Sequence, residues 1–283
     1  MPELPEIEAI RRYLILTISN QVITEVKTFR HTAIRNLPKT DFENLLNLGS
    51  LEDIERIGKI LNFVIYKGNS ILNLYLDHGL TGRLSWSTLK KLPGKTVFSI
   101  KFEQGKTLIY HDSRLHGAIW LFVNKSNKLN GVPTKIRSFG PDVLEISKED
   151  FIKRLQRFNG EIKGILTNQK FVSGIGNAYA DEILFEAKIH PFDKRPGLND
   201  EEKIRLYHAS KKILTESMNK IYHILCETQK LDNQSFWRQQ IFRIHLKGKK
   251  PCPVCGNLIS TIKAKRFTNF CRKCQNPRNR SFF

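Results

Sequence analysis

The sequence predicts an α+β multidomain protein. An N-terminal antiparallel β-sandwich with an N-terminal helix is followed by a helical domain and a short terminal domain. Three observations carry this prediction: short β-branched and aromatic runs fill the first half, helical periodicity begins after Gly140-Pro141-Asp142, and two cysteine pairs lie near the end. A chain of 283 residues also exceeds one small domain, since domains commonly hold about 100–200 residues. We expect domains over residues 1–140, 141–240 and 241–283.

The first domain is expected to begin with a helix and to continue as strands. Apolar residues recur at helical spacing from about Leu4 to Ile18, and Pro5 suits a first helical turn. Later runs are short, partly alternating and separated by turn signals such as Lys67-Gly68-Asn69. Many strands at short spacing favour an antiparallel sandwich or barrel. The expected strands are Val22–Phe29, Leu51–Ile57, Leu61–Tyr66, Ile71–Leu76, Thr96–Phe102, Thr107–Tyr110 and Ala118–Val123.

Helical periodicity dominates the chain between the Gly140-Pro141-Asp142 turn and about Cys226. A hairpin that carries the cysteine pairs is expected from about Arg243 to the end. The expected helices are Lys148–Arg157, Gly160–Leu166, Ala178–Ala187 and Asp200–Cys226.

The chain is strongly basic, with 47 Lys and Arg against 27 Asp and Glu and a formal net charge of +20. The excess is uneven, because no Asp or Glu follows Asp232. Such a charge favours a polyanionic partner, although an acidic protein surface or an anionic membrane would also suit it. The sequence shows no long apolar span, signal peptide or lipidation motif, so we expect a soluble cytoplasmic protein that binds no membrane.

Four of the five cysteines have the spacing of a metal site. Cys252 and Cys255 form one C-x2-C pair, Cys271 and Cys274 form another, and fifteen residues separate the pairs. This spacing predicts one structural Zn²⁺ held by four thiolates. Two disulfides are the alternative, which a reducing compartment disfavours. Cys226 lies in an apolar helical stretch and is expected to be a buried small hydrophobe.

The N-terminal residues offer a nucleophile. Removal of Met1 leaves Pro2 as a terminal secondary amine, and an α-amino group titrates at roughly 7.7–8.0, so a fraction is neutral at pH 7. Attack of this amine on a sugar carbon would give an iminium ion that draws electrons from neighbouring bonds. Glu3 and Glu6 lie three residues apart near the start of the first helix. The alternative is an ordinary frayed terminus, with acids that only complement the helix dipole.

Two further motifs suit contacts to phosphate. Lys59 follows Gly58 between two strand-like runs, so a tight turn would project its ammonium, as it would for any solvated turn lysine. In Gly174-Ile175-Gly176-Asn177 a Gly-x-Gly turn opens a helix, whose first N–H groups attract phosphate. The segment lacks the third glycine and the parallel βαβ unit of a dinucleotide site. A phosphate clamp with Asn177 at the helix start fits better.

Together these motifs resemble the formamidopyrimidine-DNA glycosylase and endonuclease VIII family. The resemblance rests on four segments that occur in the family's order, and Leu4 favours the formamidopyrimidine branch. It implies a helix–two-turns–helix domain with a zinc finger. It also implies a monomer whose partner is double-stranded DNA with damaged bases or abasic sites, and which is nucleoid-associated if bacterial. The segments are Met1–Glu6, Gly58-Lys59, Gly174–Glu182 and Cys252-Pro253-Val254-Cys255 with Cys271-Arg272-Lys273-Cys274-Gln275.

The resemblance also implies the reaction and the residues that perform it. The activity is that of a bifunctional DNA glycosylase and lyase of base excision repair, which removes oxidised or ring-opened bases and cuts the strand by β,δ-elimination. Pro2 is then the nucleophile at the sugar C1′, Glu3 the acid that assists ring opening, and Glu6 a supporting group. Lys59 completes the catalytic set by binding phosphate near the lesion. The implied DNA-binding residues are Lys163, Asn177 and Arg266, the last in the hairpin Lys263-Ala264-Lys265-Arg266, together with Leu80, Arg114 and His116.

Four features depart from the family pattern and bear on the lesion. Leu80 takes the place of a Met but is still an apolar wedge, whereas His116 takes the place of a Phe and stacks with less apolar area. Asp77 takes the place of a His, with His78 one position later, and no Gly-Gly-Thr segment occurs between Cys226 and Arg243. We therefore expect abasic sites, ring-opened purines or oxidised pyrimidines to be better substrates than 8-oxoguanine paired with cytosine.

Two other functions compete with this one. The first is a non-catalytic relative that binds damaged DNA, against which the intact Pro2-Glu3 pair argues. The second is a general zinc-finger nucleic-acid binder, for which the N-terminus would have no role.

Overall fold

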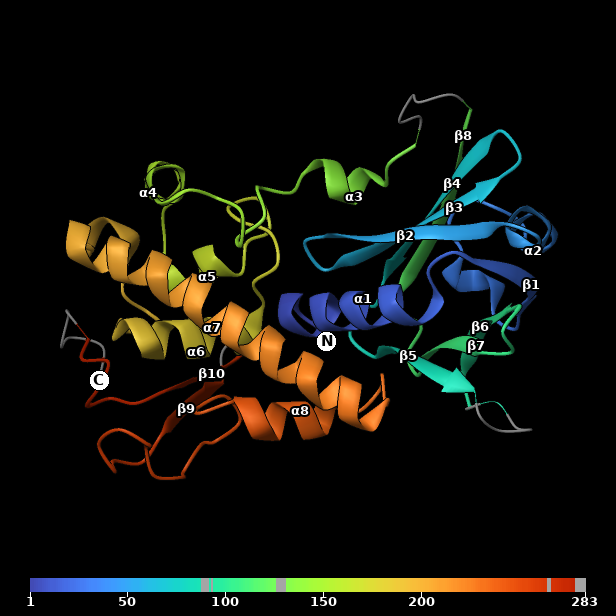
Figure 1. The fold of residues 1–283 in the computed structure, drawn as a ribbon. Coiled ribbons are helices and arrows are strands. Elements are labelled where there is room, and N and C mark those ends of the chain that lie inside the picture. The colour runs from blue at the N-terminus through green and yellow to red at the C-terminus, as the bar shows by residue number, and fades with distance from the viewer. Residues whose placement is uncertain (88–91, 93, 126–130, 264–265, 278–283) are drawn as a thin grey trace. The chain divides into compact units, whose positions relative to one another are not determined.

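The computed structural model describes residues 1–87, 92, 94–125, 131–263 and 266–277 (Figure 1). Its contacts divide the chain into two compact units, one of residues 1–137 with 221–235 and one of residues 138–220 with 236–283. The second unit therefore joins the helical region and the cysteine hairpin. The finer division into domains at residues 141 and 241 stays a prediction.

The first unit holds an eight-stranded antiparallel sheet in the order β5-β7-β6-β1-β2-β3-β4-β8. β1 pairs with β2 near Gln21 and Val22 and with β6 from Ile23 onward, so it belongs to both layers of a sandwich (Figure 1). This confirms the predicted sandwich. The strands are β1 (Gln21–Thr28), β2 (Ser50–Ile57), β3 (Ile60–Lys67), β4 (Ser70–Asp77), β5 (Gly82–Ser87), β6 (Thr96–Phe102), β7 (Thr107–Asp112) and β8 (Ala118–Lys125).

The seven expected strands form, each within two residues of its expected ends, and β5 is the strand that the sequence did not predict. Within the part of the chain that the structure describes, it pairs with β7 alone, at the end of the sheet, and its sequence Gly-Arg-Leu-Ser-Trp-Ser has few apolar residues. An edge strand has one paired side, so its burial signal is weak.

Helix α1 (Leu4–Ile18) forms where it was expected and packs against β2 and β3. A second helix, α2 (Lys39–Leu46), was not predicted, although Pro38 precedes it and its two buried residues, Phe42 and Leu46, lie four apart. The Phe42 ring lies 5.9 Å from Phe98 in the sandwich interior. The unit also contains two short helical turns, η1 (His31–Ala33) and α3 (Thr134–Arg137).

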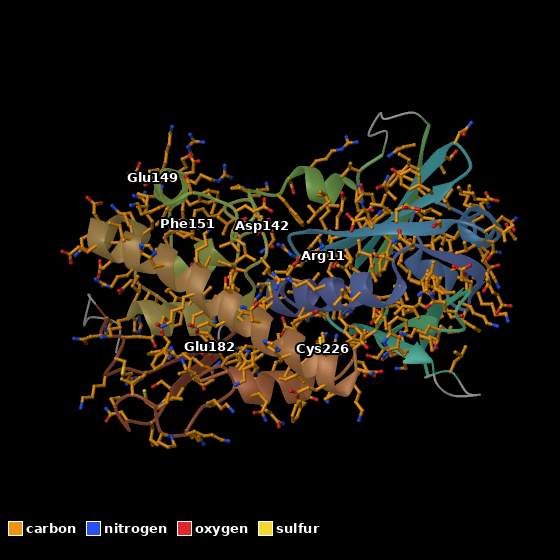
Figure 2. The ribbon with its side chains drawn as sticks, viewed as in Figure 1. Arg11, Asp142, Glu149, Phe151, Glu182 and Cys226 are labelled. Carbon is orange, nitrogen blue, oxygen red and sulfur yellow. The ribbon has the colours of Figure 1, made fainter. Side chains whose placement is uncertain are left out.

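The second unit is helical around an aromatic core. Phe151 lies on α4 (Figure 2). Its ring centroid is 5.1 Å from that of Phe171 and 5.5 Å from that of Tyr207. The expected helices form with ends shifted by one or two residues, and α8 is additional. The helices after residue 138 are α4 (Lys148–Leu155), α5 (Ile162–Leu166), α6 (Asn177–Ala187), η2 (Arg195–Gly197), α7 (Asp200–Thr228) and α8 (Gln234–Ile241). Residues 221–228 of α7 and 234–235 of α8 belong to the first unit. Among the residues that the structure describes, no helix is long and apolar enough to cross a membrane.

The expected burial of Cys226 is wrong. Its side chain is exposed on α7 (Figure 2), while Leu225 and Ile221 occupy the buried face of the helix. One residue advances a helix by about 100°, since a turn takes about 3.6 residues, so the position after a buried leucine readily faces solvent.

A two-stranded hairpin, β9 (Ser260–Lys263) and β10 (Phe267–Phe270), follows the first cysteine pair. Its small core joins the hairpin to the end of α6 through Phe185, Ile244 and Ile259, together with the cysteines.

Candidate active site

The first three residues of the candidate site lie at the start of α1. Pro2, Glu3 and Glu6 are buried, and Glu3 is the N-cap residue of the helix. The Glu6 carboxylate accepts the backbone N–H of Glu3 at 3.0 Å. Glu6 thereby fixes the residue next to Pro2, which is the supporting role that a capping carboxylate can perform.

Lys59 lies in the turn between β2 and β3. Ile57 pairs with Ile60 across this turn, and Gly58 has a φ of +60°, which a glycine adopts without steric cost. Nη1 of Arg56 donates a hydrogen bond to the Gly58 carbonyl oxygen at 3.1 Å. Nε of Arg56 donates another to the carboxylate of Glu8 in α1 at 2.9 Å. The turn that carries Lys59 is thus tied to the helix that carries Glu3 and Glu6.

Leu80, Arg114 and His116 come from two loops of the first unit. Leu80 lies between β4 and β5 and is 48% exposed, while Arg114 and His116 lie between β7 and β8 and are also exposed. The first loop begins after Asp77 of β4, which pairs with Ala118 at the end of the second loop. The first loop ends before Gly82 of β5, which pairs with Asp112 at the start of the second loop. The structure therefore brings these three predicted residues to one place.

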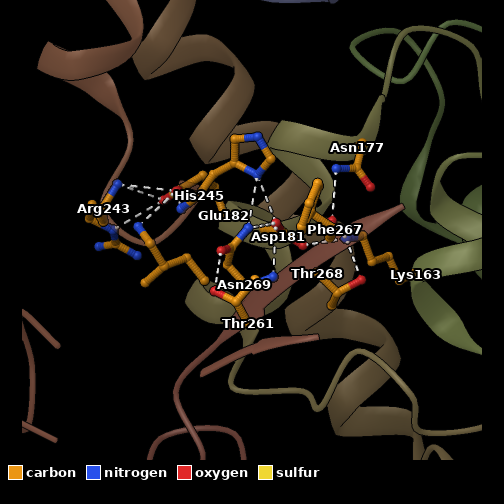
Figure 3. Close-up of polar contacts among 11 residues, drawn as sticks. Lys163, Asn177, Asp181, Glu182, Arg243, His245, Thr261, Phe267, Thr268 and Asn269 are labelled. Atoms are coloured by element: carbon orange, nitrogen blue, oxygen red, sulfur yellow. Dashed lines mark hydrogen bonds and ion pairs between the residues drawn. The ribbon is translucent and has the colours of Figure 1, made fainter. Parts of the chain in front are cut away.

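In the second unit, Asn177 and Lys163 meet at one backbone carbonyl (Figure 3). Nδ2 of Asn177 and Nζ of Lys163 each donate to the carbonyl oxygen of Phe267 at 3.0 Å. Phe267 directly follows Arg266, whose side chain is exposed. Residues 264 and 265 of the predicted hairpin tip lie outside the described part of the chain.

The ammonium of Lys163 is buried in an internal network. It forms an ion pair with Asp181 at 2.6 Å and donates to the Thr268 hydroxyl at 2.9 Å. The other Asp181 oxygen contacts Nδ1 of His245 at 2.7 Å and accepts from the Asn269 side chain (Figure 3). A direct role of Lys163 in DNA binding stays a prediction, and the network gives it a structural task in holding β10.

Glu182 is a site residue to which the sequence reasoning assigned no role. Its carboxylate accepts the backbone N–H groups of Arg243, Ile244 and His245 at 2.8 to 3.1 Å, so it fixes the segment that leads into the cysteine hairpin. Burial raises the pKa of Glu182, against the effect of these donors. Two adjacent acids, Asp181 and Glu182, in a helix of mostly apolar residues were the signal that could have revealed this network.

The four sulfur atoms of Cys252, Cys255, Cys271 and Cys274 lie within 4.8 Å of one another. Opposite members of the two pairs are 3.8 and 3.4 Å apart, far beyond the ~2.05 Å of a disulfide bond. Four thiolates at ~2.3 Å from Zn²⁺ in a tetrahedron would be about 3.8 Å apart. The cluster therefore fits one structural zinc ion, which would fix the hairpin to the helical core.

Comparisons with known proteins match this chain to formamidopyrimidine-DNA glycosylases over nearly all of its length. Residues 1–119 match the formamidopyrimidine-DNA glycosylase N-terminal domain, residues 139–225 the H2TH domain of the same family, and residues 249–277 the zinc finger found in FPG and IleRS. Formamidopyrimidine-DNA glycosylase of Mycoplasma mobile is 32% identical over 276 residues, which cover 97% of this chain and 99% of the relative. That of Ureaplasma parvum is 32% identical and covers 98% and 100%.

Solved structures give the same result. The Lactococcus lactis Fpg in complex with DNA containing an abasic site superposes with a TM-score of 0.83, at 26% identity, and covers 97% of this chain and all of that chain. The same enzyme with Fapy-dG DNA gives equal values.

The chain belongs to the formamidopyrimidine-DNA glycosylase family. It is accordingly a DNA glycosylase of base excision repair that also has lyase activity at abasic sites.

Proposed function

We propose that Pro2, once Met1 is removed, is the nucleophile of this enzyme. The observation that carries the proposal is the start of α1, where Pro2 is buried beside Glu3 and where Glu6 fixes the Glu3 backbone. A buried amine next to two carboxyl groups is well placed for covalent catalysis with proton transfer.

The reaction then uses one amine and one acid. The lone pair of the Pro2 nitrogen forms a bond to C1′, and the bond from C1′ to the damaged base breaks. The base takes the electron pair of that bond and the proton that the Pro2 nitrogen loses. Glu3 donates a proton to the ring oxygen O4′ when the C1′–O4′ bond opens, which leaves an iminium ion. Loss of a C2′ proton then expels the 3′ phosphate, and a second elimination expels the 5′ phosphate.

The remaining residues would hold the DNA. Lys59, Asn177 and Arg266 suit phosphate contacts, which position a duplex without reading its sequence. Leu80, Arg114 and His116 would occupy the space of the flipped nucleoside. The substrate is duplex DNA with a damaged base or an abasic site. We further propose that the protein acts as a monomer in the cytoplasm, at the nucleoid.

Borohydride trapping tests the nucleophile. Incubation with abasic duplex DNA and borohydride should give a covalent adduct that peptide mapping places on Pro2. Retention of Met1 or an N-terminal tag should abolish the adduct, whereas the same tag at the C-terminus should not. Undiminished trapping by Pro2→Gly, with the adduct on Lys59, would show that Lys59 and not Pro2 is the nucleophile. Absence of any adduct with tight binding of the same DNA would favour the non-catalytic relative.

A further inference from the structure

The two loops that present Leu80, Arg114 and His116 share one buried carboxylate. The loops join strands that pair at both ends, since Asp77 faces Ala118 and Gly82 faces Asp112 in the sheet. Asp112 ends β7 and is only 1% exposed. Asp112 therefore lies at the start of one loop and beside Gly82, where the other loop ends.

Asp112 accepts hydrogen bonds from both loops. Oδ2 accepts the N–H of Gly117 at 2.7 Å, and Oδ1 accepts the N–H of Arg114 at 3.2 Å. Oδ1 also accepts the hydroxyl of Thr81, which follows Leu80 in the other loop. The Thr81 oxygen in turn accepts the same Arg114 N–H at 3.2 Å. One carboxylate thus fixes residues next to all three exposed side chains.

Close packing reinforces this connection. A Cβ on Gly79 would lie 2.5 Å from the carbonyl of His116, so the loops touch through their backbones. Cβ atoms on Gly82 and Gly117 would lie 2.2 and 2.0 Å from the Tyr110 hydroxyl, which occupies the space beneath both loops. Neither loop can shift far without the other, because the interior between them is full.

The carboxylate is suited to this task because it is ionised and only accepts. Burial opposes ionisation, but the hydrogen bonds from Thr81, Gly117 and Arg114 together hold the pKa of Asp112 below its usual value. An asparagine has a single acceptor oxygen, and its amide group would face one of the N–H donors. The difference between Asp and Asn is therefore a direct probe of the arrangement.

We propose that Asp112 is a positioning residue that makes the two loops one rigid wedge, so that Leu80, Arg114 and His116 enter the duplex together. The inference rests on the proposed role of these three residues in filling the place of the flipped nucleoside. A rigid wedge loses little conformational entropy on insertion, whereas two independent loops would each lose it. Asp112 would thereby govern steps that need base flipping and leave the covalent chemistry of the terminal amine unchanged.

The test compares duplex and single-stranded substrates. We expect Asp112→Asn to lower the single-turnover excision rate of a ring-opened purine in duplex DNA about tenfold, which corresponds to about 1.4 kcal/mol. A single-stranded abasic oligonucleotide has no opposite base for the protein to displace. The rate of borohydride trapping on it should therefore stay within about twofold of wild type. The fluorescence of 2-aminopurine, placed opposite an abasic analogue, should rise less on binding of the variant.

Matched variants complete the design. Thr81→Val removes one donor and should act like Asp112→Asn, whereas Thr81→Ser keeps the hydroxyl and should restore wild-type behaviour. Asp41→Asn, an exposed charge on α2, controls for the loss of one negative charge. If Asp112→Asn does not fold, Thr81→Val carries the test.

Unchanged duplex excision and fluorescence in both variants would overturn the proposal, as would an equal loss on single strands and duplexes. The fluorescence measurement needs binding only. It therefore decides the proposal even if the wild-type protein gives no covalent adduct, a result that would contradict the nucleophile instead.

Discussion

The guanidinium of Arg56 donates to the carboxylate of Glu8 at 2.9 Å, and both side chains are less than 10% exposed. Glu8 lies on α1, five residues after Glu3, and Arg56 lies three residues before Lys59. Burial opposes ionisation of Glu8, but Arg11 and Arg56 together hold its pKa below the usual value. The buried pair therefore fixes the Lys59 turn relative to α1, the helix that begins two residues after Pro2.

Arg56→Lys should slow borohydride trapping about tenfold. Lysine keeps the charge, but it lacks the planar guanidinium that reaches both Glu8 and the Gly58 carbonyl, so the Lys59 turn loses its support. The measurement is the single-turnover trapping rate, together with the affinity for a duplex that contains a non-cleavable abasic analogue. Arg12→Lys is the control, because Arg12 also contacts Glu8 but is 39% exposed. A trapping rate equal to wild type in Arg56→Lys would refute this coupling.

Zinc should be present at one ion per chain. Cys252→Ser removes one of four thiolates and should weaken binding to duplex DNA, since Arg266 lies in the hairpin that the metal would fix. Metal analysis and a binding isotherm measure the two effects. Cys226→Ser, an exposed cysteine outside the cluster, should change neither. Full activity in a reduced sample without zinc would contradict the prediction.

Lesion preference should favour ring-opened purines and abasic sites over 8-oxoguanine opposite cytosine. His116 offers less stacking area than a phenylalanine, and α8 occupies the stretch in which no Gly-Gly-Thr segment occurs. One lost contact of about 1–3 kcal/mol corresponds to roughly tenfold or more in rate. Excision rates on matched duplexes measure the preference. His116→Phe restores the stacking area, so it should increase discrimination between the bases opposite the lesion relative to wild type. A rate on 8-oxoguanine at or above that on the ring-opened purine would show the expectation to be wrong.

Stability should fall in mild acid because of His78. Both of its ring nitrogens are buried without a hydrogen-bond partner, and burial lowers its pKa to about 4, with Asp77 opposing and Arg83 reinforcing the shift. Between pH 6.5 and 4 the unfolded chain binds a proton that the folded chain excludes, so stability rises with pH in this window. The loss from pH 7 to pH 5 should be about 2 kcal/mol, at ~1.4 kcal/mol per unit below the unfolded pKa.

Urea unfolding at the two pH values measures this loss in wild type and in His78→Leu. The variant lacks the titrating group, so its pH-dependent loss should be smaller by about that amount. An equal loss in both proteins would assign the acid sensitivity to other groups.

Much of the local structure could be predicted from the sequence. The extent of α1, seven strands and four helices followed from periodicity and turn residues, because these signals lie within a few residues of the element they specify. The elements that were not predicted, such as β5 and α2, are short and have few buried apolar side chains. The predicted burial of Cys226 was wrong, because an apolar stretch does not indicate which face of a long helix is buried.

The sequence by itself determined the Gly58-Lys59 turn and the four-cysteine cluster, because each depends on residue type and short spacing. The terminal amine of Pro2 stays a prediction. Only the tertiary structure decided that Lys163 pairs with Asp181 and reaches the carbonyl of Phe267, about a hundred residues away in the chain. It also decided that Asp112 accepts hydrogen bonds from two loops, through Thr81 in one and Gly117 in the other. Contacts of this kind depend on strand register and on the packing of distant segments. A buried charge finds its partners only after those segments have come together, so no local pattern in the chain records them.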